Sequence, residues 1–262
     1  MDKTLRSAAT GLTSQQRYVE IISNNIANVN TTGFKKSRPE FQDLLYETLK
    51  PAGNNTRLGN EPLNEVQIGS GTQLVSTTKM FKQGDITQTN NPLDMSIVGE
   101  GFFIVRKPDN SLTYTRDGSF KMDRNGQLVT SQGNMLDPGF RIPQDAMDVK
   151  ISRDGMVSIL TPGSVEHQNI GQIEVARFIN PAGLRAIGDN QFVATPASGD
   201  AIFQQPGSNN TGEIYQSHLE SSNVDIVEEM VNMITAQRAY ELNSKSVRTA
   251  DDILATAVQL KR

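Results

Sequence analysis

The end of this chain constrains its fold most, because residues 223–262 repeat apolar side chains with the heptad spacing of a coiled coil. Ten positions, starting at residue 226, lie alternately four and three residues apart, and seven of them are apolar. These seven are Ile226, Met230, Met233, Tyr240, Val247, Leu254 and Val258. No Gly or Pro interrupts the segment. We therefore expect one long amphipathic helix whose apolar stripe needs a partner.

This predicted helix also carries start and stop signals. Ser222 or Asn223 is expected to cap its N-terminus, since their side chains accept hydrogen bonds from the first free N–H groups. Acidic residues fill the first turns, beginning with Asp225, and residues 261–262 are basic. Both charge placements favour the helix dipole, which supports a helix that begins near residue 225 and runs to the end of the sequence.

A matching repeat occupies the other end of the chain. From residue 5 to residue 29, positions step alternately by three and four, and Gln15 is the polar exception. The seam predicted on this segment comprises Leu5, Leu12, Val19, Ile22, Ile26 and Val29, with Ala8 between the first two. We expect the two ends to pair as a coiled coil and to form an assembly seam. The alternative is two ordinary amphipathic helices on a globular core, which such regular heptads disfavour.

Glycine and asparagine residues punctuate the first predicted helix. Gly11 lies in its interior, where either its cost is simply tolerated or it lets another backbone approach closely. Gly33 is expected to stop the helix, which should end before residues 31–33. Asn24 and Asn28 lie roughly opposite the seam at 100° per residue. They indicate either a solvated face, which is favoured, or neighbours on both sides.

The middle of the chain divides into two regions of different character. Residues 35–72 are a predicted connecting region with a long arm, because residues 51–65 are rich in Asn, Gly and Pro. A disordered linker is the alternative for that stretch. Residues 73–220 are predicted to form a β-rich domain of antiparallel hairpins. The expected strands cover residues 97–98, 102–105, 120–122, 128–129, 149–151, 157–159 and 173–175. Tight hairpin turns are expected at Asp117-Gly118, Asn125-Gly126 and Asp154-Gly155.

Composition excludes several classes of function. The net charge of −4 argues against general nucleic-acid binding, and no apolar run is long enough for a transmembrane helix. The N-terminal residues lack the pattern of a secretory signal, and the absence of Cys excludes thiolate sites. His167 and His218 stand outside any metal motif, and adjacent carboxylates on the last helix diverge by 100°. We expect no enzyme activity, no cofactor and no metal.

Two segments resemble a known family. The run SNNIANVNTTGFK at residues 23–35 closely matches the N-terminal signature of bacterial flagellar basal-body rod and hook proteins. The run EMVNMI at residues 229–234, followed by QRAYE at 237–241, is similar to the family's C-terminal end, and residues 101–129 resemble its β domain. The arm, from residue 41 to residue 69, resembles the distal rod branch, although residues 54–65 match poorly. The family motif places its marked residues at Asn24, Asn25, Asn28, Gly33, Phe34, Gln237, Arg238 and Tyr240.

The resemblance implies an α+β fold in three parts. Residues 1–34 and 221–262 would form an inner coiled-coil domain, residues 35–72 the connecting region and residues 73–220 an outer β domain. It also implies a structural subunit of the distal rod, which polymerises helically into the drive shaft that transmits motor torque to the hook and filament. Expected partners are further copies, proximal rod proteins, the hook protein and surrounding ring proteins, without nucleic acid or membrane insertion. The expected location is the basal body in the periplasm, reached by flagellar type III export without a cleaved signal peptide.

Two alternatives remain at this point. A proximal rod or hook protein of the same family would share both terminal motifs, although hook proteins of this family usually have a longer chain. A secreted enzyme that acts on peptidoglycan would carry the helices for assembly only. The sequence shows no paired carboxylates in a recognisable cleft motif, which speaks against that enzyme.

Overall fold

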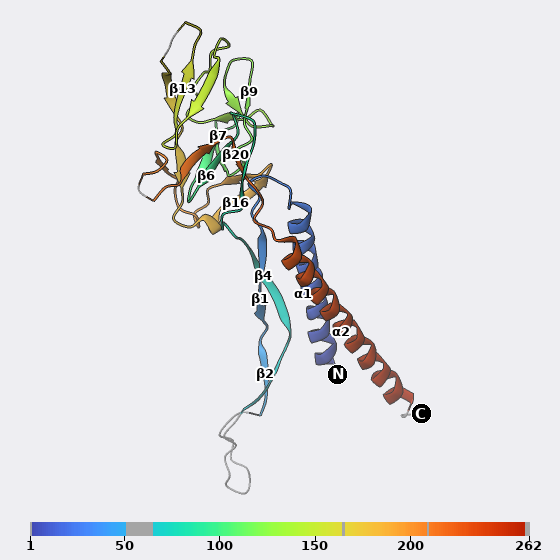
Figure 1. The fold of residues 1–262 in the computed structure, drawn as a ribbon. Coiled ribbons are helices and arrows are strands. Elements are labelled where there is room, and N and C mark those ends of the chain that lie inside the picture. The colour runs from blue at the N-terminus through green and yellow to red at the C-terminus, as the bar shows by residue number, and fades with distance from the viewer. Residues whose placement is uncertain (1, 51–64, 164–165, 209, 260–262) are drawn as a thin grey trace. The chain divides into compact units, whose positions relative to one another are not determined.

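The chain contains a long helix at each end and antiparallel strands between them, as an α+β class requires (Figure 1). The computed structural model describes residues 2–50, 65–163, 166–208 and 210–259. The described chain divides into two compact units. We call Met1–Ala27, Ser37–Thr78 and Asp225–Arg262 the helical unit, and Asn28–Lys36 and Lys79–Val224 the β unit. The three-part domain division remains a prediction; residues 37–78 fall in the same compact unit as both helices.

The helical unit is built on α1 (Asp2–Ala27) and α2 (Ile226–Gln259). Asp225 caps α2: its Oδ1 accepts hydrogen bonds from the N–H groups of Val227 at 2.8 Å and Glu228 at 3.2 Å. The expectation of a cap at Ser222 or Asn223 is therefore wrong. Asp225 serves because it directly precedes the first helical residue, where a short carboxylate reaches the free N–H groups of the first turn.

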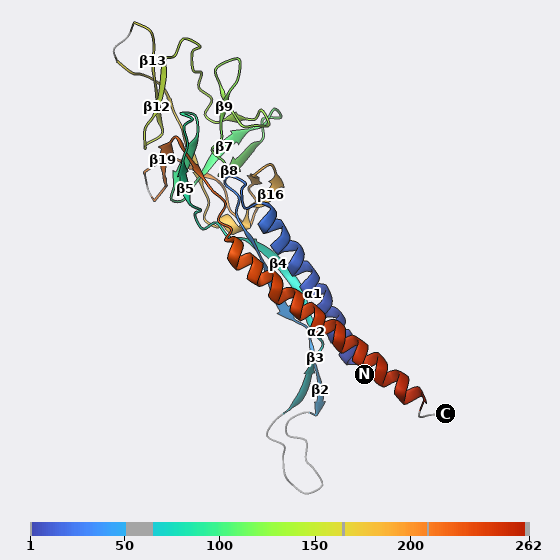
Figure 2. The same ribbon diagram turned by 45° about the vertical axis from the view of Figure 1, so that its right-hand side comes forward.

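The two helices run antiparallel and pack against each other along α1 (Figures 1 and 2). Ala8 and Ile22 of α1 and Ala236 and Ala250 of α2 are buried. No helix in the described parts of the chain is both long and apolar enough to span a membrane.

Two strand pairs complete the helical unit. β1 (Ser37–Asp43) pairs with β4 (Thr72–Lys79), and β2 (Tyr46–Lys50) pairs antiparallel with β3 (Val66–Gly69). The β1–β4 ribbon packs on α1, where Phe41 meets Tyr18 edge to face with ring centroids 6.1 Å apart. Residues 51–64 of the predicted arm lie outside the described residues.

A nine-stranded sheet forms most of the β unit, in the order β16-β17-β8-β7-β11-β10-β9, with β15 pairing β7 and β18. Smaller sheets combine β12, β13 and β14, β6 with β19, and β5 with β20. The bounds are β5 (Ile86–Gln88), β6 (Met95–Val98), β7 (Phe102–Arg106), β8 (Leu112–Thr115), β9 (Lys121–Met122), β10 (Leu128–Val129), β11 (Met135–Leu136), β12 (Asp148–Ile151), β13 (Met156–Leu160), β14 (Gln168–Gln172), β15 (Val175–Arg177), β16 (Arg185–Gly188), β17 (Gln191–Val193), β18 (Ile202–Gln204), β19 (Glu213–Gln216) and β20 (His218–Glu220).

Strand β7 separates two hydrophobic cores. Phe103 and Val105 join one buried cluster, whereas Phe102 and Ile104 join another. Successive side chains of a strand point to opposite faces, so a continuous apolar run buries both faces of β7. The β unit therefore has its own apolar interior.

Two of the three predicted turns are present. Gly126 and Gly155 have φ values of +75° and +80° and lie in the short loops, residues 123–127 and 152–155, that connect β9 to β10 and β12 to β13. The expected hairpin at Asp117-Gly118 is wrong. These residues follow β8, and the Gly118 carbonyl accepts a hydrogen bond from Met95 N at 3.0 Å. A Cβ at Gly118 would lie 1.6 Å from the Met95 oxygen, so this glycine permits a close approach between chain segments.

Candidate assembly surface

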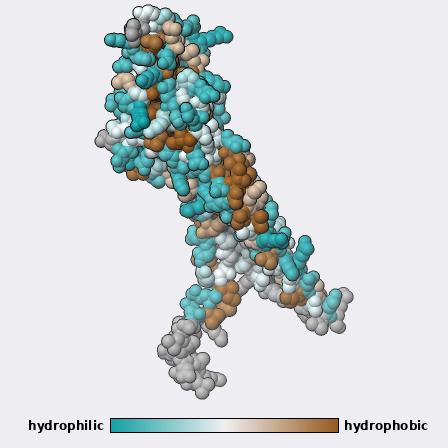
Figure 3. Space-filling view, viewed as in Figure 1, coloured by the Kyte–Doolittle hydropathy of each residue, from teal (hydrophilic) through white to brown (hydrophobic). Residues whose placement is uncertain are grey.

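The start of α2 exposes a cluster of large apolar side chains, which we call the apolar face of α2. Its members are all more than a third exposed, and Val227 reaches 70%. The apolar face comprises Ile226, Val227, Met230, Val231 and Ile234. Figure 3 shows apolar side chains gathered over the part of the helix pair where α2 begins. An exposed apolar cluster of this kind marks an interaction surface in a soluble protein.

Most of the apolar face, namely Val227, Val231 and Ile234, points away from α1. The buried side chains described in α2 are Glu229, Ala236 and Ala250, which repeat at multiples of seven residues. This line faces α1, because Glu229 contacts Asn25. At 100° per residue, Val231 lies 200° from Glu229, on the far side of the helix. The line that packs on α1 is thus small or polar, and the larger apolar side chains remain outside.

The predicted seam residues are distributed unevenly. On the N-terminal side, Ile22 is buried, and Leu5, Leu12, Val19, Ile26 and Val29 are half-buried. On α2, Met233, Val247 and Leu254 are half-buried, whereas Ile226, Met230, Tyr240 and Val258 are exposed. The structure therefore leaves part of the predicted stripe of α2 open to another molecule. Its role as an assembly seam remains a prediction.

Asn25 ties three elements of the helical unit together. Its side chain is 1% exposed, and its Oδ1 accepts a hydrogen bond from Ser37 N at 2.9 Å. Its Nδ2 donates to the Ser37 carbonyl at 2.9 Å and to Oε2 of Glu229 at 3.1 Å. One amide thus joins α1 to the first residue of β1 and to α2. The buried polar groups are satisfied at the point where all three meet.

The other motif residues of the helices have different surroundings. Asn24 is exposed on α1, whereas Asn28 lies beyond the end of α1 and accepts a hydrogen bond from Thr31 Oγ1 at 3.2 Å. Gln237 is exposed, and Arg238 is paired with Glu241 at 3.0 Å on the surface of α2. The structure therefore does not gather the motif into one site.

Gly11 lies against α2. A Cβ at Gly11 would lie 2.8 Å from Nδ2 of Asn243, which is closer than a carbon atom normally approaches. The neighbour is a side chain, so the expectation that Gly11 admits another backbone is corrected in this detail. Because glycine has no side chain, Gly11 on α1 leaves room for the Asn243 amide on α2.

Residues 31–35 of the motif are built into the β unit. Gly33 has a φ of +67°, and a Cβ there would lie 2.6 Å from the backbone of Arg116 and Asp117. Thr32 Oγ1 donates to Asp117 Oδ1 at 2.8 Å, and Gly33 N donates to the Glu220 carbonyl at 2.8 Å. Gly33 is therefore not the helix stop that its spacing suggested, since α1 already ends at Ala27. Its positive φ serves a close approach to the β unit.

A buried ion cluster holds the same region. Lys35 Nζ lies 2.5 Å from Oε1 of Glu220, and Arg116 Nη1 lies 3.3 Å from the other carboxylate oxygen. Other donors of the two cations bind backbone carbonyls, including Lys82 O at 2.9 Å and Gly99 O at 2.6 Å, whereas the buried Nε of Arg116 has no hydrogen-bond partner. Removal from water lowers the pKa of Lys35 below its usual value, and the nearby Glu220 carboxylate opposes that shift.

Phe34 and Asn223 make further contacts beside the buried ion cluster. The Lys79 ammonium lies 4.5 Å from the centre of the Phe34 ring. Asn223 Oδ1 accepts a hydrogen bond from Lys36 N at 2.8 Å, while its Nδ2 donates to the Met80 and Lys82 carbonyls at 2.7 and 2.9 Å. The side chain expected to cap α2 instead binds residue 36, which directly follows the motif, and residues 80 and 82.

Sequence reasoning missed the ion cluster. Lys35 belongs to a basic run, and nothing in the composition distinguishes it from Lys36. Glu220 follows a polar stretch without a motif of its own. Because charged residues are mostly exposed, a pattern of residue types does not identify the rare buried pair.

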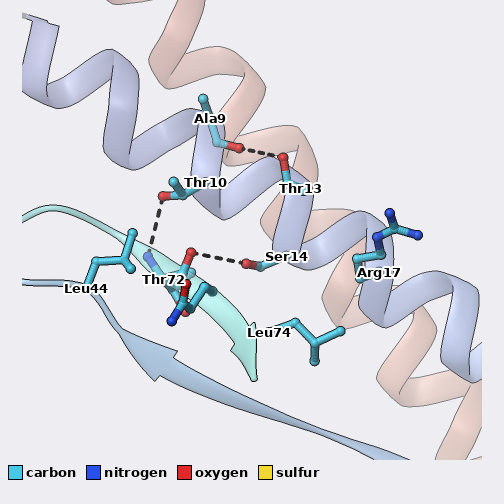
Figure 4. Close-up of a pocket in the computed structure, with 9 residues that line it drawn as sticks. Ala9, Thr10, Thr13, Ser14, Arg17, Leu44, Thr72 and Leu74 are labelled. Atoms are coloured by element: carbon cyan, nitrogen blue, oxygen red, sulfur yellow. Dashed lines mark hydrogen bonds between the residues drawn. The ribbon is translucent and has the colours of Figure 1, made fainter. Parts of the chain in front are cut away.

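A cavity of about 500 Å³ lies between α1 and β4 in the helical unit (Figure 4). Its hydroxyl groups bind the backbone: Thr13 Oγ1 donates to Ala9 O at 3.1 Å, and Ser14 Oγ donates to Thr72 O at 3.5 Å. Thr10 Oγ1 accepts from Thr72 N at 3.4 Å. The Thr10 and Ser14 hydroxyls hold the ribbon on the helix, whereas the Thr13 hydroxyl bonds within α1. The described parts of the chain contain no cluster of three or more potential metal ligands.

Three family models match this chain. The model "Flagella basal body rod protein" matches residues 5–35, and "Flagellar hook protein FlgE/F/G D1 domain" matches residues 96–159. The third, "Flagellar basal body rod FlgEFG protein C-terminal", matches residues 215–260. The matched segments include both helices and the central strands of the β unit.

Similar proteins extend over the full length. The flagellar basal-body rod protein FlgG of Borreliella burgdorferi is 49% identical over 265 residues, which cover 100% of both chains. FlgG of Bacillus subtilis is 38% identical, again over 100% of both chains. The flagellar hook protein FlgE of Helicobacter mustelae is 38% identical over 172 residues, which are 65% of this chain and 37% of the hook protein. This chain therefore belongs to the family of flagellar basal-body rod and hook proteins, within which FlgG rod proteins match it from end to end.

Proposed function

We propose that this protein is a structural subunit of the flagellar basal-body rod and that the apolar face of α2 joins it to further copies. The observation that carries the proposal is the position of that face, on the side of α2 opposite α1. A helix pair that already packs through its small residues has no intramolecular use for these five large side chains. Their burial between copies would supply the hydrophobic driving force for polymerisation.

The exposed apolar side chains of α2 are most closely spaced in its first turns, although Leu242 and Ile253 are also exposed farther along the same side. Farther along the same side, the exposed residues include Glu241, Lys245, Arg248 and Asp252. A short apolar cluster followed by charges gives a neighbouring copy a defined position along the helix. Such a surface suits ordered association better than a uniformly apolar stripe, which would tolerate sliding.

The pairing of both ends as a coiled coil is the finer part of this proposal. It is supported by the antiparallel contact of α1 with α2 and by the heptad spacing of the buried line Glu229, Ala236 and Ala250. The exposed members of the predicted seam, Ile226, Met230, Tyr240 and Val258, would then contact other copies. The inner coiled-coil layer, the connecting arm and the outer β layer would together form a stiff shaft.

The wider biological setting follows from family membership. Helical polymerisation, transmission of motor torque, export through the flagellar type III channel and a periplasmic position all belong to the proposal. So do contacts with proximal rod, hook and ring proteins. The partial match to a hook protein, which covers 37% of that relative, disfavours the hook alternative. Full-length similarity to proteins named as rod proteins likewise disfavours a peptidoglycan-acting enzyme.

Val231→Asp tests the proposed surface. A carboxylate there must lose its water shell when the surface is buried in an assembly, yet it stays hydrated in the free chain. In a strain without its own rod protein, we expect the variant to be made but to give no distal rod in electron micrographs of basal bodies. Thr249→Asp is the matched control, because it lies eighteen residues away, five full helical turns, on the same side of α2. Normal rods with Val231→Asp would refute this role of the face.

A further inference from the structure

The contact between Gly11 and Asn243 is not used by the proposed assembly surface. Each of the three heavy atoms nearest to a Cβ at Gly11 belongs to the Asn243 side chain, at 2.8, 3.3 and 3.6 Å. The amide of Asn243 is half-buried and fills the space beside the α1 backbone. Geometrically, Asn243 is a knob on α2, and Gly11 is the notch on α1 that accepts it.

This contact shares its register with the Asn25–Glu229 contact. On α1, Gly11 precedes Asn25 by fourteen residues, and on α2, Asn243 follows Glu229 by fourteen residues. Because the helices are antiparallel, equal spacing means that both pairs belong to one alignment of α1 against α2. Fourteen residues are two heptads, the interval at which the same side of a paired helix returns to its partner.

We propose that Asn243 and Gly11, together with Asn25 and Glu229, fix the register of α1 against α2, with Asn243 as a positioning residue. The inference rests on the proposed rod function, because the register determines where the apolar face of α2 lies along α1. The alanines on the buried line do not suffice for this task. Ala236 and Ala250 lie two heptads apart and present the same small surface, so they would fit equally well after a slip.

The polar residues disfavour an alignment in which α1 and α2 are shifted by one heptad. It moves one helix by about 10 Å along the other. In one direction Asn243 would face Thr4, and Glu229 would face Tyr18 in place of Asn25. In the other direction Asn243 would face Tyr18, and Asn25 would face Ala236. Both alignments remove the glycine notch from the asparagine and separate Asn25 from Glu229, which leaves buried polar groups without the partners they have here.

The test is a double-mutant cycle in the full-length chain, with Gly11→Ala, Asn243→Ala and the two combined. Each form is expressed in a strain without its own rod protein, and swimming motility and protein level are measured. We expect Gly11→Ala to reduce motility more than Asn243→Ala does, because its methyl group displaces the Asn243 amide from its place beside α1. Asn243→Ala should reduce motility partially, since Asn25 and Glu229 still set the register. The combined variant should recover the motility of Asn243→Ala.

Thermal unfolding of the purified chains supplies a second readout. Replacing Gly by Ala inside a helix ordinarily stabilises it. Gly11→Ala should therefore lower the melting temperature when Asn243 is present and raise it in the Asn243→Ala background. This reversal of sign identifies the contact and not the helix propensity of the residue.

The outcomes separate the two proposals. If the unaltered chain does not restore motility, the rod function itself fails. If it does restore motility, but Gly11→Ala swims normally or the combined variant is as defective as Gly11→Ala alone, the register proposal is overturned and the rod function stands. Rescue by Asn243→Ala together with the reversed melting shift would establish it.

Discussion

Nδ2 of Asn25 donates a hydrogen bond to Oε2 of Glu229 over 3.1 Å, although the two residues lie 204 positions apart in the chain. Both side chains are buried, at 1% and 4% exposure, and the same Asn25 amide also closes on the backbone of Ser37. The family motif therefore has a structural meaning at this position. Its second asparagine brings both helices and the first strand of the ribbon together.

Asn25→Ala should lower the stability of the helical unit. The substitution leaves the N–H and carbonyl of Ser37 and the Glu229 carboxylate without this partner in a buried place. The expected loss is about 2–3 kcal/mol of unfolding free energy, since an unsatisfied buried group costs about 1–3 kcal/mol. Urea unfolding followed by circular dichroism at the helical signal measures it.

Asn24→Ala is the matched control for this prediction. Asn24 is the adjacent residue of the same helix and is exposed. Surface substitutions usually change stability by less than about 0.5 kcal/mol. Equal effects of the two alanine variants would contradict the role given to Asn25.

Gly33→Ala should destabilise the β unit by more than its backbone conformation alone explains. A side chain at a φ of +67° is strained, and its Cβ would also lie 2.6 Å from the backbone of Arg116 and Asp117. We expect a loss of about 3 kcal/mol or more, of which about 1–2 kcal/mol comes from the left-handed backbone. The measurement is chemical unfolding followed by a probe of the β unit.

Gly133→Ala isolates the backbone contribution. Gly133 also belongs to the β unit and has a φ of +85°, but a Cβ there would meet no atom within 4 Å. Its loss should stay near the conformational cost of about 1–2 kcal/mol. If Gly33→Ala cost no more than Gly133→Ala, the tight contact of the motif with residues 116 and 117 would have no energetic weight.

Lys35→Met should also weaken the β unit. The substitution removes the cation that lies 2.5 Å from the fully buried Glu220 carboxylate and leaves Arg116 as the remaining charged partner. Breaking a buried pair at one partner typically costs about 3–5 kcal/mol, and the remaining Arg116 should hold the loss at the lower end. Lys36→Met is the control, because Lys36 is the adjacent residue and is less buried. A larger loss of stability in Lys36→Met than in Lys35→Met would contradict the role given to the Lys35–Glu220 pair.

The same lysine predicts a pH dependence. Burial lowers the pKa of Lys35 in the folded chain below the ordinary lysine value of 10.5, so the folded state releases this proton at lower pH than the unfolded state. At pH values between the folded pKa of Lys35 and 10.5, the unfolded chain binds more protons at this lysine than the folded chain does. The unfolding free energy therefore increases as the pH rises through this range. The stability difference between the unaltered chain and Lys35→Met should therefore grow as pH approaches 10.5. A difference that shrinks over that range would show that the ion pair outweighs burial.

Several features of the fold follow from local patterns. Heptad spacing predicted both helices, and the apolar run 102–105 predicted the strand that lies between two cores. Asn125-Gly126 and Asp154-Gly155 marked real turns because a positive φ is a local requirement that glycine meets. At residues 117–118 the same type of dipeptide does not form a hairpin turn, because Gly118 is needed there for the close approach of the Met95 carbonyl, which is distant in sequence. A long-range contact leaves no periodic signal.

The side of α2 that meets α1 was not predictable from apolar spacing. Hydrophobic residues mark the stripe that needs burial, but they do not say whether the chain itself or another molecule buries it. Here the intramolecular line runs through Glu229, Ala236 and Ala250, one residue before positions 230, 237 and 251 of the expected stripe. This line packs on α1 because its alanines are small and because Glu229 pairs with Asn25. Both reasons depend on the residues of α1 that lie opposite.

The last prediction concerns the free subunit. The contact of α2 with α1 buries two alanines and a glutamate, while the apolar face stays in water. Helices draw most of their stability from packing, so this contact should make the helical unit the less stable of the two units before assembly. The β unit has two apolar cores and the buried Lys35–Glu220 pair, and Asn223 holds the segment beside residue 36. Limited proteolysis of the soluble chain, read by mass spectrometry, should first cut before residue 28 and after residue 224. Circular dichroism of the free subunit on heating should show the helical signal falling before the β unit unfolds. Terminal segments as resistant to protease as the β unit would contradict this order of events.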